Sequence, residues 1–299
     1  MMEEQNNGAS AAKYGLYEPL YRPGQKVSAD TFLPWKIRDN SAGSWREFRI
    51  LVDMYRHGVH RRHTATGLFS PKFALKAKIA PDELTRFADA QSDFDVCFVN
   101  PFPQLPYWSF NAWMQGEHVH PGLREAAQAL LNESGIEWDL AAVPRQDASV
   151  LAYCNFWIGT PRFWDAYIGG ILVPIAEFLE SHPDHPAARA VMIDTTHTDP
   201  APFLPFIVER LFSTYLSFNP SCRALAYPIP GDAIGKYCID EFEQLLLAYM
   251  RPMVDEADRT GQFDQRLVEQ MDFMCALWTR HFLDFYAHVP HPHTGKTLR

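Results

Sequence analysis

The segment 153–164 (YCNFWIGTPRFW) constrains the fold of this chain more than any other stretch. It is typical of a buried strand that ends in polar and aromatic groups and turns directly into a helix, with Thr160 and Pro161 at the helix start. A second segment, 205–212 (PFIVERLF), predicts a helix start with an adjacent acid and base inside an apolar run. Strand-to-helix turns are where α/β enzymes hold ligands, because strand ends and helix N-termini meet there. The two segments therefore favour an enzyme without naming its reaction.

Strands alternate with helices along the first two thirds of the chain. The apolar patterns predict strands at 64–69, 96–99 and 150–157, and helices at 44–58, 81–90, 121–135 and 160–180. This alternation is typical of an α/β fold with a mostly parallel sheet flanked by helices. Four uninterrupted apolar residues at 96–99 indicate a strand buried on both faces. Ser44 and Glu47 have the spacing of a capping box at the first helix.

Beyond residue 238 the pattern changes. Two amphipathic helices, 240–258 and 263–286, are joined by a short connection and predict an antiparallel helical hairpin. We therefore divide the chain into four parts. The stretch 14–43, at the start of the second part, is expected to be irregular. The parts are a disordered leader at 1–13, an α/β domain at 14–238, a C-terminal helical extension at 239–289, and a flexible tail at 290–299.

Composition limits the classes of protein that this chain can be. Of 299 residues, 47% are hydrophobic, which is enough for a large core and excludes global disorder. The net charge of −9 argues against nonspecific nucleic-acid binding. Five scattered cysteines without a Cys-x-x-Cys spacing fit a reducing compartment. With no signal peptide or membrane span in the sequence, we expect a soluble cytoplasmic protein, and the amphipathic C-terminal helices leave an oligomer open.

Several motifs, taken in order, resemble a known family. They are the helix 45–55, the segment 66–73 (TGLFSPKF), Asp95 with its strand, the segment 116–121 (GEHVHP), the segment 155–157 (NFW), and the segment 205–212. Over roughly residues 40–220 this order resembles a family of bacterial glycosyltransferases often encoded with capsule or lipopolysaccharide O-antigen genes. Their fold is similar to the GT-A type, a Rossmann-like nucleotide-sugar sheet with helices on both faces.

The resemblance implies transfer of a sugar from a nucleotide-sugar donor to a cell-surface glycan or a lipid-linked acceptor. It also implies a cytoplasmic location, with a peripheral position at the inner face of the membrane left open. Most GT-A enzymes bind a divalent metal through an Asp-x-Asp motif, whereas here Val99-Asn100-Pro101 takes that place. Asp194 and Asp199 could replace this motif only if the fold placed them beside the donor diphosphate. We therefore expect weak or absent dependence on manganese or magnesium.

Glu209 is the first candidate for a catalytic base. An acid among apolar neighbours either faces solvent or is held for a reason, because burying it unpaired is costly. A carboxylate can take the proton of an acceptor hydroxyl in an inverting transfer. The structural alternative is a salt bridge with Arg210 or another base.

His118 and His120 alternate on what we expect to be an extended segment, beside Glu117. Both rings would then face one side and could act as base, phosphate donor or metal ligand. The alternative is a solvated loop before a Pro-started helix. Two histidines without a nearby third ligand are weak support for zinc.

The remaining substrate-binding candidates are polar or aromatic. Asn155 and Trp157 share one side of their strand and could bind a sugar hydroxyl and a sugar ring, or belong to the core. Trp113, with Trp108, lies in a loop region where a sugar platform is more plausible. A diphosphate could be bound by the residues that follow the strand at 64–69 and by Arg210. Gly67 lies in this strand, and Ser70, Lys72 and Lys76 follow it. The resemblance adds Asp95, where an acid of the family lies near the nucleotide, and Asn100, which stands in the place of the metal-binding motif.

We expect Asn155, Trp157, Glu209 and the 117–120 segment to meet in one cleft at the carboxyl edge of the sheet. A noncatalytic carbohydrate- or partner-binding protein on the same fold is the alternative function, because fold alone does not establish catalysis.

Overall fold

The computed structural model describes residues 12–37, 43–91, 93–195 and 201–298. Its main sheet has six strands in the order β2-β1-β3-β5-β4-β8. The strands are β1 (Tyr14–Leu20), β2 (Leu33–Lys36), β3 (Ala65–Leu68), β4 (Val96–Phe98), β5 (Trp157–Gly159) and β8 (Ala224–Ala226). Two short strands, β6 (Asp194–Thr195) and β7 (Ala201–Pro202), form a separate pair.

The main sheet is mixed, so the prediction of a mostly parallel sheet is wrong. Strand β5 runs antiparallel to both of its neighbours, with Thr66 of β3 opposite Gly159, and Cys97 of β4 opposite Ile158. The other pairs are parallel. The strand predicted at 150–157 is a loop until Trp157, and this loop enters β5 at the edge where β3 and β4 end. The start of β5 therefore lies beside the ends of its neighbours.

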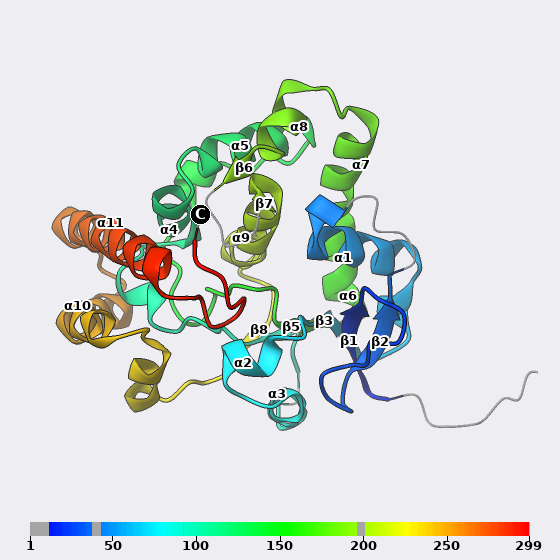
Figure 1. The fold of residues 1–299 in the computed structure, drawn as a ribbon, viewed down its shortest axis with the longest axis horizontal. Coiled ribbons are helices and arrows are strands. Elements are labelled where there is room, and N and C mark those ends of the chain that lie inside the picture. Colours follow the sequence, from blue (N-terminus) through cyan, green and yellow to red (C-terminus); the bar gives the residue numbers. More distant parts are fainter. Residues whose placement is uncertain (1–11, 38–42, 92, 196–200, 299) are drawn as a thin grey trace, which may run out of the picture.

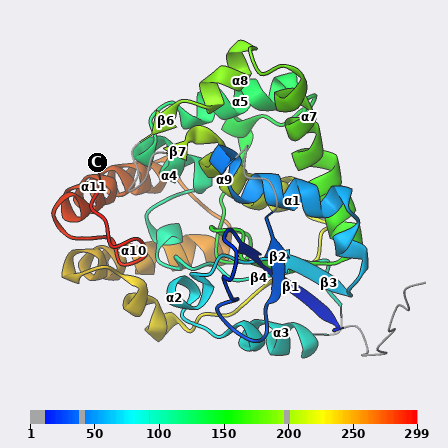
Figure 2. The same ribbon diagram turned by 45° about the vertical axis from the view of Figure 1, so that its right-hand side comes forward.

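Helices cover both faces of the sheet (Figures 1 and 2). On one face lie α1 (Glu47–Arg56), the π-helical η5 (Trp164–Leu172) and α9 (Phe203–Phe218), and on the other lie α2 (Phe73–Ala77) and α3 (Pro81–Asp89). Strand β4 is buried on both faces, as predicted. Phe98 packs on Phe212 of α9 with ring centroids 5.4 Å apart, whereas Cys97 belongs to the cluster on the α2 side.

The other helical elements connect the strands or cover α9. They are η1 (Gly43–Trp45), η2 (Val59–Arg61), η3 (Leu105–Tyr107), α4 (Ala112–Val119), α5 (Leu123–Glu133), η4 (Leu140–Ala142), α6 (Pro161–Phe163), α7 (Val173–Ser181), α8 (Pro186–Val191) and η6 (Gly231–Tyr237). Thr160 caps α6 as predicted, its side chain accepting a hydrogen bond from the Phe163 N–H. The predicted capping box at Ser44 is wrong, because Ser44 lies within η1 and Arg46 precedes α1.

The stretch 14–43, predicted to be irregular, contains β1 and β2. The Pro, Gly and isolated aromatic residues of this stretch led to that prediction, and β1 also carries a charged residue, Glu18. In the fold this side chain is buried, and its carboxylate accepts hydrogen bonds from the backbone N–H and the hydroxyl of Ser28. Burial of a charged group is tolerated here because local donors satisfy it.

The predicted C-terminal helical hairpin is present as α10 (Glu241–Thr260) and α11 (Gln265–His288). Asp240 and Asp264 cap the two helices, and Gly261 takes a positive φ of 68° at the end of α10. The helices pack side by side (Figure 1), with Gln270 donating to the Tyr249 hydroxyl at 3.1 Å.

Both ends of the described chain contact the folded domain. Most of the predicted leader, residues 1–11, lies outside the described residues, whereas Lys13 forms an ion pair with Asp89. Residues 290–298, expected to be a flexible tail, fold back toward the sheet (Figure 1). Within the described ranges, no helix combines the length and the apolar character needed to cross a membrane.

Candidate functional site

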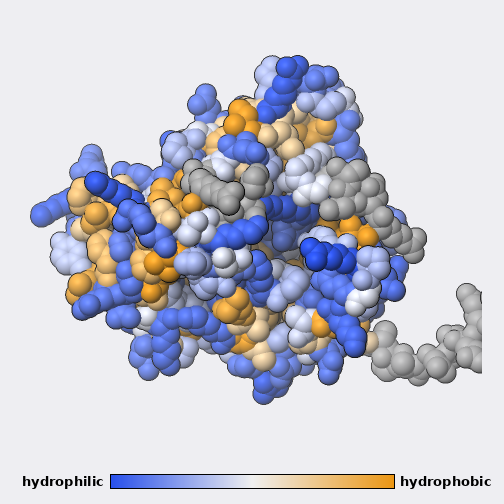
Figure 3. All heavy atoms as spheres, viewed as in Figure 1, coloured by the Kyte–Doolittle hydropathy of each residue, from blue (hydrophilic) through white to orange (hydrophobic). Residues whose placement is uncertain are grey.

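A cavity of about 770 Å³ opens at the carboxyl edge of the sheet. Figure 3 shows a hollow in the middle of this face, with hydrophilic residues around it. Its walls include the start of α1, the loop before α2 with α2 itself, the loop after β4, the end of α4, the loop before β5 and the first turns of α9. The segment from Tyr237 into α10, the second half of α11 and the residues after α11 also line it. Lining residues include Ser70, Lys72, Lys76, Lys78, Phe102, His120, Tyr153, Cys154, Glu209, Arg210, Tyr237, Tyr286, His291, Pro292, His293 and Thr294.

Two backbone features bring these walls together. Gly67 of β3 approaches β5 so closely that an added Cβ would lie 2.0 Å from the Trp157 carbonyl oxygen. Before β5, Cys154 and Asn155 both take positive φ angles, of 65° and 52°. This conformation is uncommon for residues other than glycine and marks a tightly constrained turn. The turn presents the Cys154 N–H to α9.

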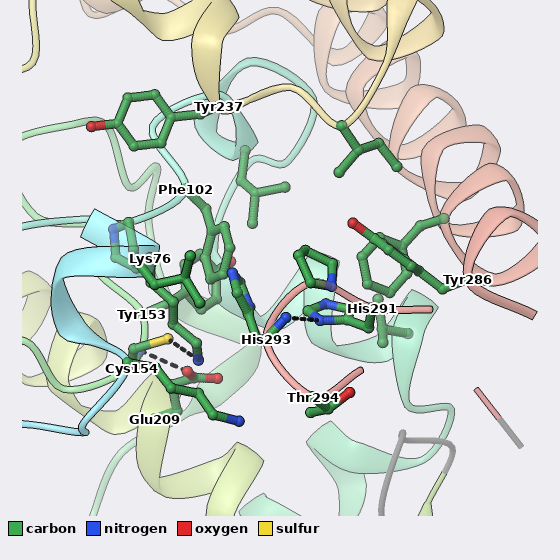
Figure 4. A pocket seen from close by; sticks show the side chains of 18 of the residues that line it. Lys76, Phe102, Tyr153, Cys154, Glu209, Tyr237, Tyr286, His291, His293 and Thr294 are labelled. Carbon is green, nitrogen blue, oxygen red and sulfur yellow. Dashed lines mark hydrogen bonds between the residues drawn. The ribbon is translucent and has the colours of Figure 1, made fainter. Parts of the chain in front are cut away.

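Lys76, Cys154 and Glu209 form the centre of the site (Figure 4). The Cys154 N–H donates to Glu209 Oε1 at 2.6 Å, and Lys76 Nζ donates to Cys154 Sγ at 3.2 Å. Burial raises the pKa of the Cys154 thiol to about 12, so it is protonated at neutral pH. Burial alone would lower the pKa of Lys76, but its contact with Cys154 Sγ and the negative charge of Glu209 raise it above its ordinary value. A charged ammonium group is therefore held beside a carboxylate.

The α2 side of the cavity carries positive charge. Lys72, Lys76 and Lys78 all line it from the α2 side. Like charges focused in a concave site raise the local concentration of an oppositely charged ligand. Lys78 is also tied to the backbone carbonyl of Lys236. The ammonium groups on this wall suit a phosphate or carboxylate better than a neutral ligand.

Arg210 lines the cavity, but most of the hydrogen bonds of its guanidinium go to groups within the protein. Its side chain is 2% exposed and donates to the carbonyl oxygens of Ala112 and Phe206 and to the Gln115 side chain. Its closest approach to Glu209 is 3.9 Å. The salt-bridge alternative for Glu209 is therefore only weakly realised. Arg210 fixes the start of α9 against α4.

The structure separates the residues of the 117–120 segment. This segment lies at the end of helix α4, so the prediction of an extended segment is wrong, and positions two apart do not share a helix face. Of the three candidates Glu117, His118 and His120, His120 alone lines the cavity, where its ring stacks on Phe206 at 4.1 Å and hydrogen-bonds Thr195 Oγ1 at 3.0 Å. His118 pairs with Asp272 of α11 at 2.8 Å. Glu117 accepts hydrogen bonds from the backbone at the start of α5.

The aromatic candidates lie in the core instead. Trp157 stacks on Phe212 with ring centroids 5.9 Å apart, and Trp113 donates its indole N–H to Thr214 Oγ1 at 2.8 Å. Trp108 is fully buried as well. The Asn155 side-chain oxygen is buried, with no hydrogen-bond partner among the described residues. None of these four side chains is among the residues that line the cavity.

Two further candidates have local structural roles. Asp95 precedes β4, at the edge of the sheet opposite the cavity, and pairs with Arg223. Asn100 follows β4, and its side chain closes a turn by accepting a hydrogen bond from the Phe102 N–H at 3.0 Å. Ser70 lines the cavity, and its hydroxyl accepts a hydrogen bond from the Lys72 N–H at 3.2 Å.

Sequence patterns missed the residues that the C-terminal segment and the loops bring to the cavity. Cys154 was within reach of prediction, because it directly precedes the singled-out Asn155. His291 and His293 carry no such signal, since they follow the last helix in a polar, Pro-containing stretch. Burial together with the positive charge of Lys76 lowers the pKa of His293 to about 3, so its imidazole is neutral.

A metal site does not emerge from the described part of the chain. No group of three or more His, Cys, Asp or Glu side chains there is placed to hold a metal ion. Asp194 is exposed on β6, and Asp199 lies outside the described residues.

Comparison with known proteins gives no match: no protein-family model, no curated protein and no solved structure matches this chain.

Proposed function

We propose that this protein is a glycosyltransferase that moves a sugar from a nucleotide-sugar donor to a glycan or lipid-linked acceptor. The observation that carries the proposal is that Glu209 and Lys76 both hydrogen-bond Cys154 inside a cavity whose α2 wall bears three lysines. Such a cavity offers what this reaction needs: positive charge for a leaving diphosphate and a carboxylate for the acceptor proton. The order of motifs along the chain supports the same choice.

In this proposal Glu209 is the base. Its Oε1 atom is held by the Cys154 N–H, which orients the carboxylate. The carboxylate takes the proton of the acceptor hydroxyl while that oxygen forms its bond to the anomeric carbon. The bond from the anomeric carbon to the diphosphate breaks, and its electron pair leaves with the phosphate oxygen. Lys72 and Lys76 stabilise the negative charge that develops there.

The aromatic residues of the cavity suit the sugar. Phe102, Tyr237 and Tyr286 all line it (Figure 4). One face of a pyranose is largely C–H and packs well on an aromatic ring. We place the reaction in the cytoplasm, and at the inner face of the membrane if the acceptor is lipid-linked.

A ligand screen on the full chain tests the proposal. The melting temperature is measured with UDP, GDP, CMP and dTDP sugars, with and without manganese. A ligand at a hundred times its Kd stabilises the native state by about 2.7 kcal/mol, so the matching nucleotide raises the melting temperature by several degrees. Lys76→Met is expected to lose this shift, whereas Lys26→Met, an exposed lysine outside the cavity, keeps it.

The outcomes separate the candidate functions. If no nucleotide or nucleotide sugar shifts the melting temperature, the transferase proposal fails. Binding of a sugar without any transfer to glycan acceptors would favour the noncatalytic carbohydrate-binding alternative.

A further inference from the structure

The residues after α11 form a compact turn that reaches the cavity. We call residues 290–298 the C-terminal turn. The His291 N–H donates to the Lys296 carbonyl at 2.8 Å, and the Leu298 N–H donates to the Tyr286 carbonyl at 2.9 Å. The His291 ring packs on the Tyr286 ring with centroids 4.4 Å apart. These contacts fasten both ends of the turn to α11.

The fastened ends direct the middle of the turn into the cavity. Pro292, His293 and Thr294 all line it (Figure 4). The cavity keeps its volume of about 770 Å³ with the turn in place. The turn is therefore one wall of the cavity and does not fill it.

His293 lies toward the centre of the site, on the side of Lys76 (Figure 4). Its backbone N–H donates to His291 Nδ1 at 3.2 Å, which fixes the direction of the loop. Burial lowers the pKa of the His293 ring, and the positive charges of Lys76, His291, Lys72 and Lys78 lower it further. A neutral imidazole can donate one N–H to a bound oxyanion, and an anion beside the lysines removes the repulsion that opposes its protonation.

We propose that the C-terminal turn is a functional part of the binding site, and that His293 binds the anionic group of the ligand together with Lys76 and Lys72. This inference rests on the anion site of the proposed function and names one more residue of that site. Packing of a chain end would explain the contacts of Leu298 and His291 with α11. It does not explain why the loop between them turns a polar ring toward three lysines.

Titration calorimetry with inorganic pyrophosphate tests the inference on the full chain. His293→Ala is expected to weaken binding about tenfold, which corresponds to about 1.4 kcal/mol, the contribution of one charge-assisted hydrogen bond. Deleting residues 290–299 is expected to weaken it at least as much. The matched control is His288→Ala in the last turn of α11, outside the cavity, which should bind like the unchanged protein. Circular dichroism and the melting temperature check that each variant is folded.

Lys76→Met separates failure of this inference from failure of the proposed function. If Lys76→Met loses binding while His293→Ala and the deletion keep it, the anion site stands and the role of the turn is overturned. Tighter binding by the deletion variant would also overturn it, since the turn would then obstruct the site. If pyrophosphate does not bind, or binds equally well to Lys76→Met, both proposals fail. Should the deletion variant be unfolded, His293→Ala alone decides.

Discussion

Asp95 and Glu209 are acids at opposite edges of the same sheet, and their surroundings differ. The Asp95 carboxylate accepts hydrogen bonds from the Arg223 backbone N–H at 2.9 Å and from its guanidinium at 3.2 Å. It is 5% exposed. The Glu209 side chain is 21% exposed, receives one backbone hydrogen bond and faces a cavity beside Lys76.

The difference distinguishes a structural carboxylate from a functional candidate. Asp95 has its oxygens occupied by Arg223, which directly precedes β8, so it joins β4 to that segment and has little capacity left for a ligand. Glu209 is oriented by a backbone N–H but keeps an oxygen toward the cavity. An acid that is held in place yet incompletely bonded is suited to accept a proton from a substrate.

The largest expected effect is that of Glu209→Gln on turnover. Glutamine keeps the oxygen that accepts from the Cys154 N–H but loses the charge and the basicity. We expect turnover to fall about a hundredfold or more, which is a barrier increase of about 2.7 kcal/mol. The free energy of unfolding should fall by about 1 kcal/mol or less.

Transfer assays and thermal melts on the same samples check this prediction. Glu269→Gln, an exposed acid on α11 outside the cavity, is the matched control and should leave both quantities unchanged. Turnover near normal in Glu209→Gln would remove Glu209 from the chemistry. A large loss of stability together with activity would instead make it a structural residue like Asp95.

Asp95→Asn should show the opposite pattern. Its charge-assisted hydrogen bonds to Arg223 join β4 to the segment that leads into β8, so their loss should cost about 2 kcal/mol of unfolding free energy. We set the cost no higher because the Arg223 side chain is 46% exposed and solvent screens the pair. Chemical denaturation measures the loss, and turnover of the folded fraction should stay near normal. A drop in turnover without a drop in stability would break the comparison between the two acids.

The smallest expected effect concerns the turn that holds Glu209. Asn155 has a φ of 52°, and its buried side-chain oxygen has no partner among the described residues. Alanine and glycine both remove that oxygen, so the difference between Asn155→Ala and Asn155→Gly isolates the backbone conformation. The left-handed region costs alanine about 1 kcal/mol more than glycine, and we expect Asn155→Gly to be the more stable variant by that amount. Equal denaturation midpoints would show that the turn is not strained.

Local sequence patterns predicted much of the secondary structure. Apolar runs placed β3 and β4, helical periodicity placed α3, α10 and α11, and Thr160 marked the start of a helix correctly. These predictions depend on interactions between near neighbours in the chain. The same analysis selected Glu209, His120 and the lysines of α2, because charged and polar groups in apolar surroundings or after strands are visible in the sequence.

Tertiary structure decided the rest. The direction of β5 depends on how the loop at 150–156 crosses the edge of the sheet, which no local pattern encodes. Trp113 and Trp157 are core residues because distant helices cover them. His293 belongs to the cavity only because α10 and α11 carry the end of the chain back to α2. Sequence alone determined which groups were available for chemistry, while long-range packing decided which of them meet, since residues far apart in the chain become neighbours only after the core has formed.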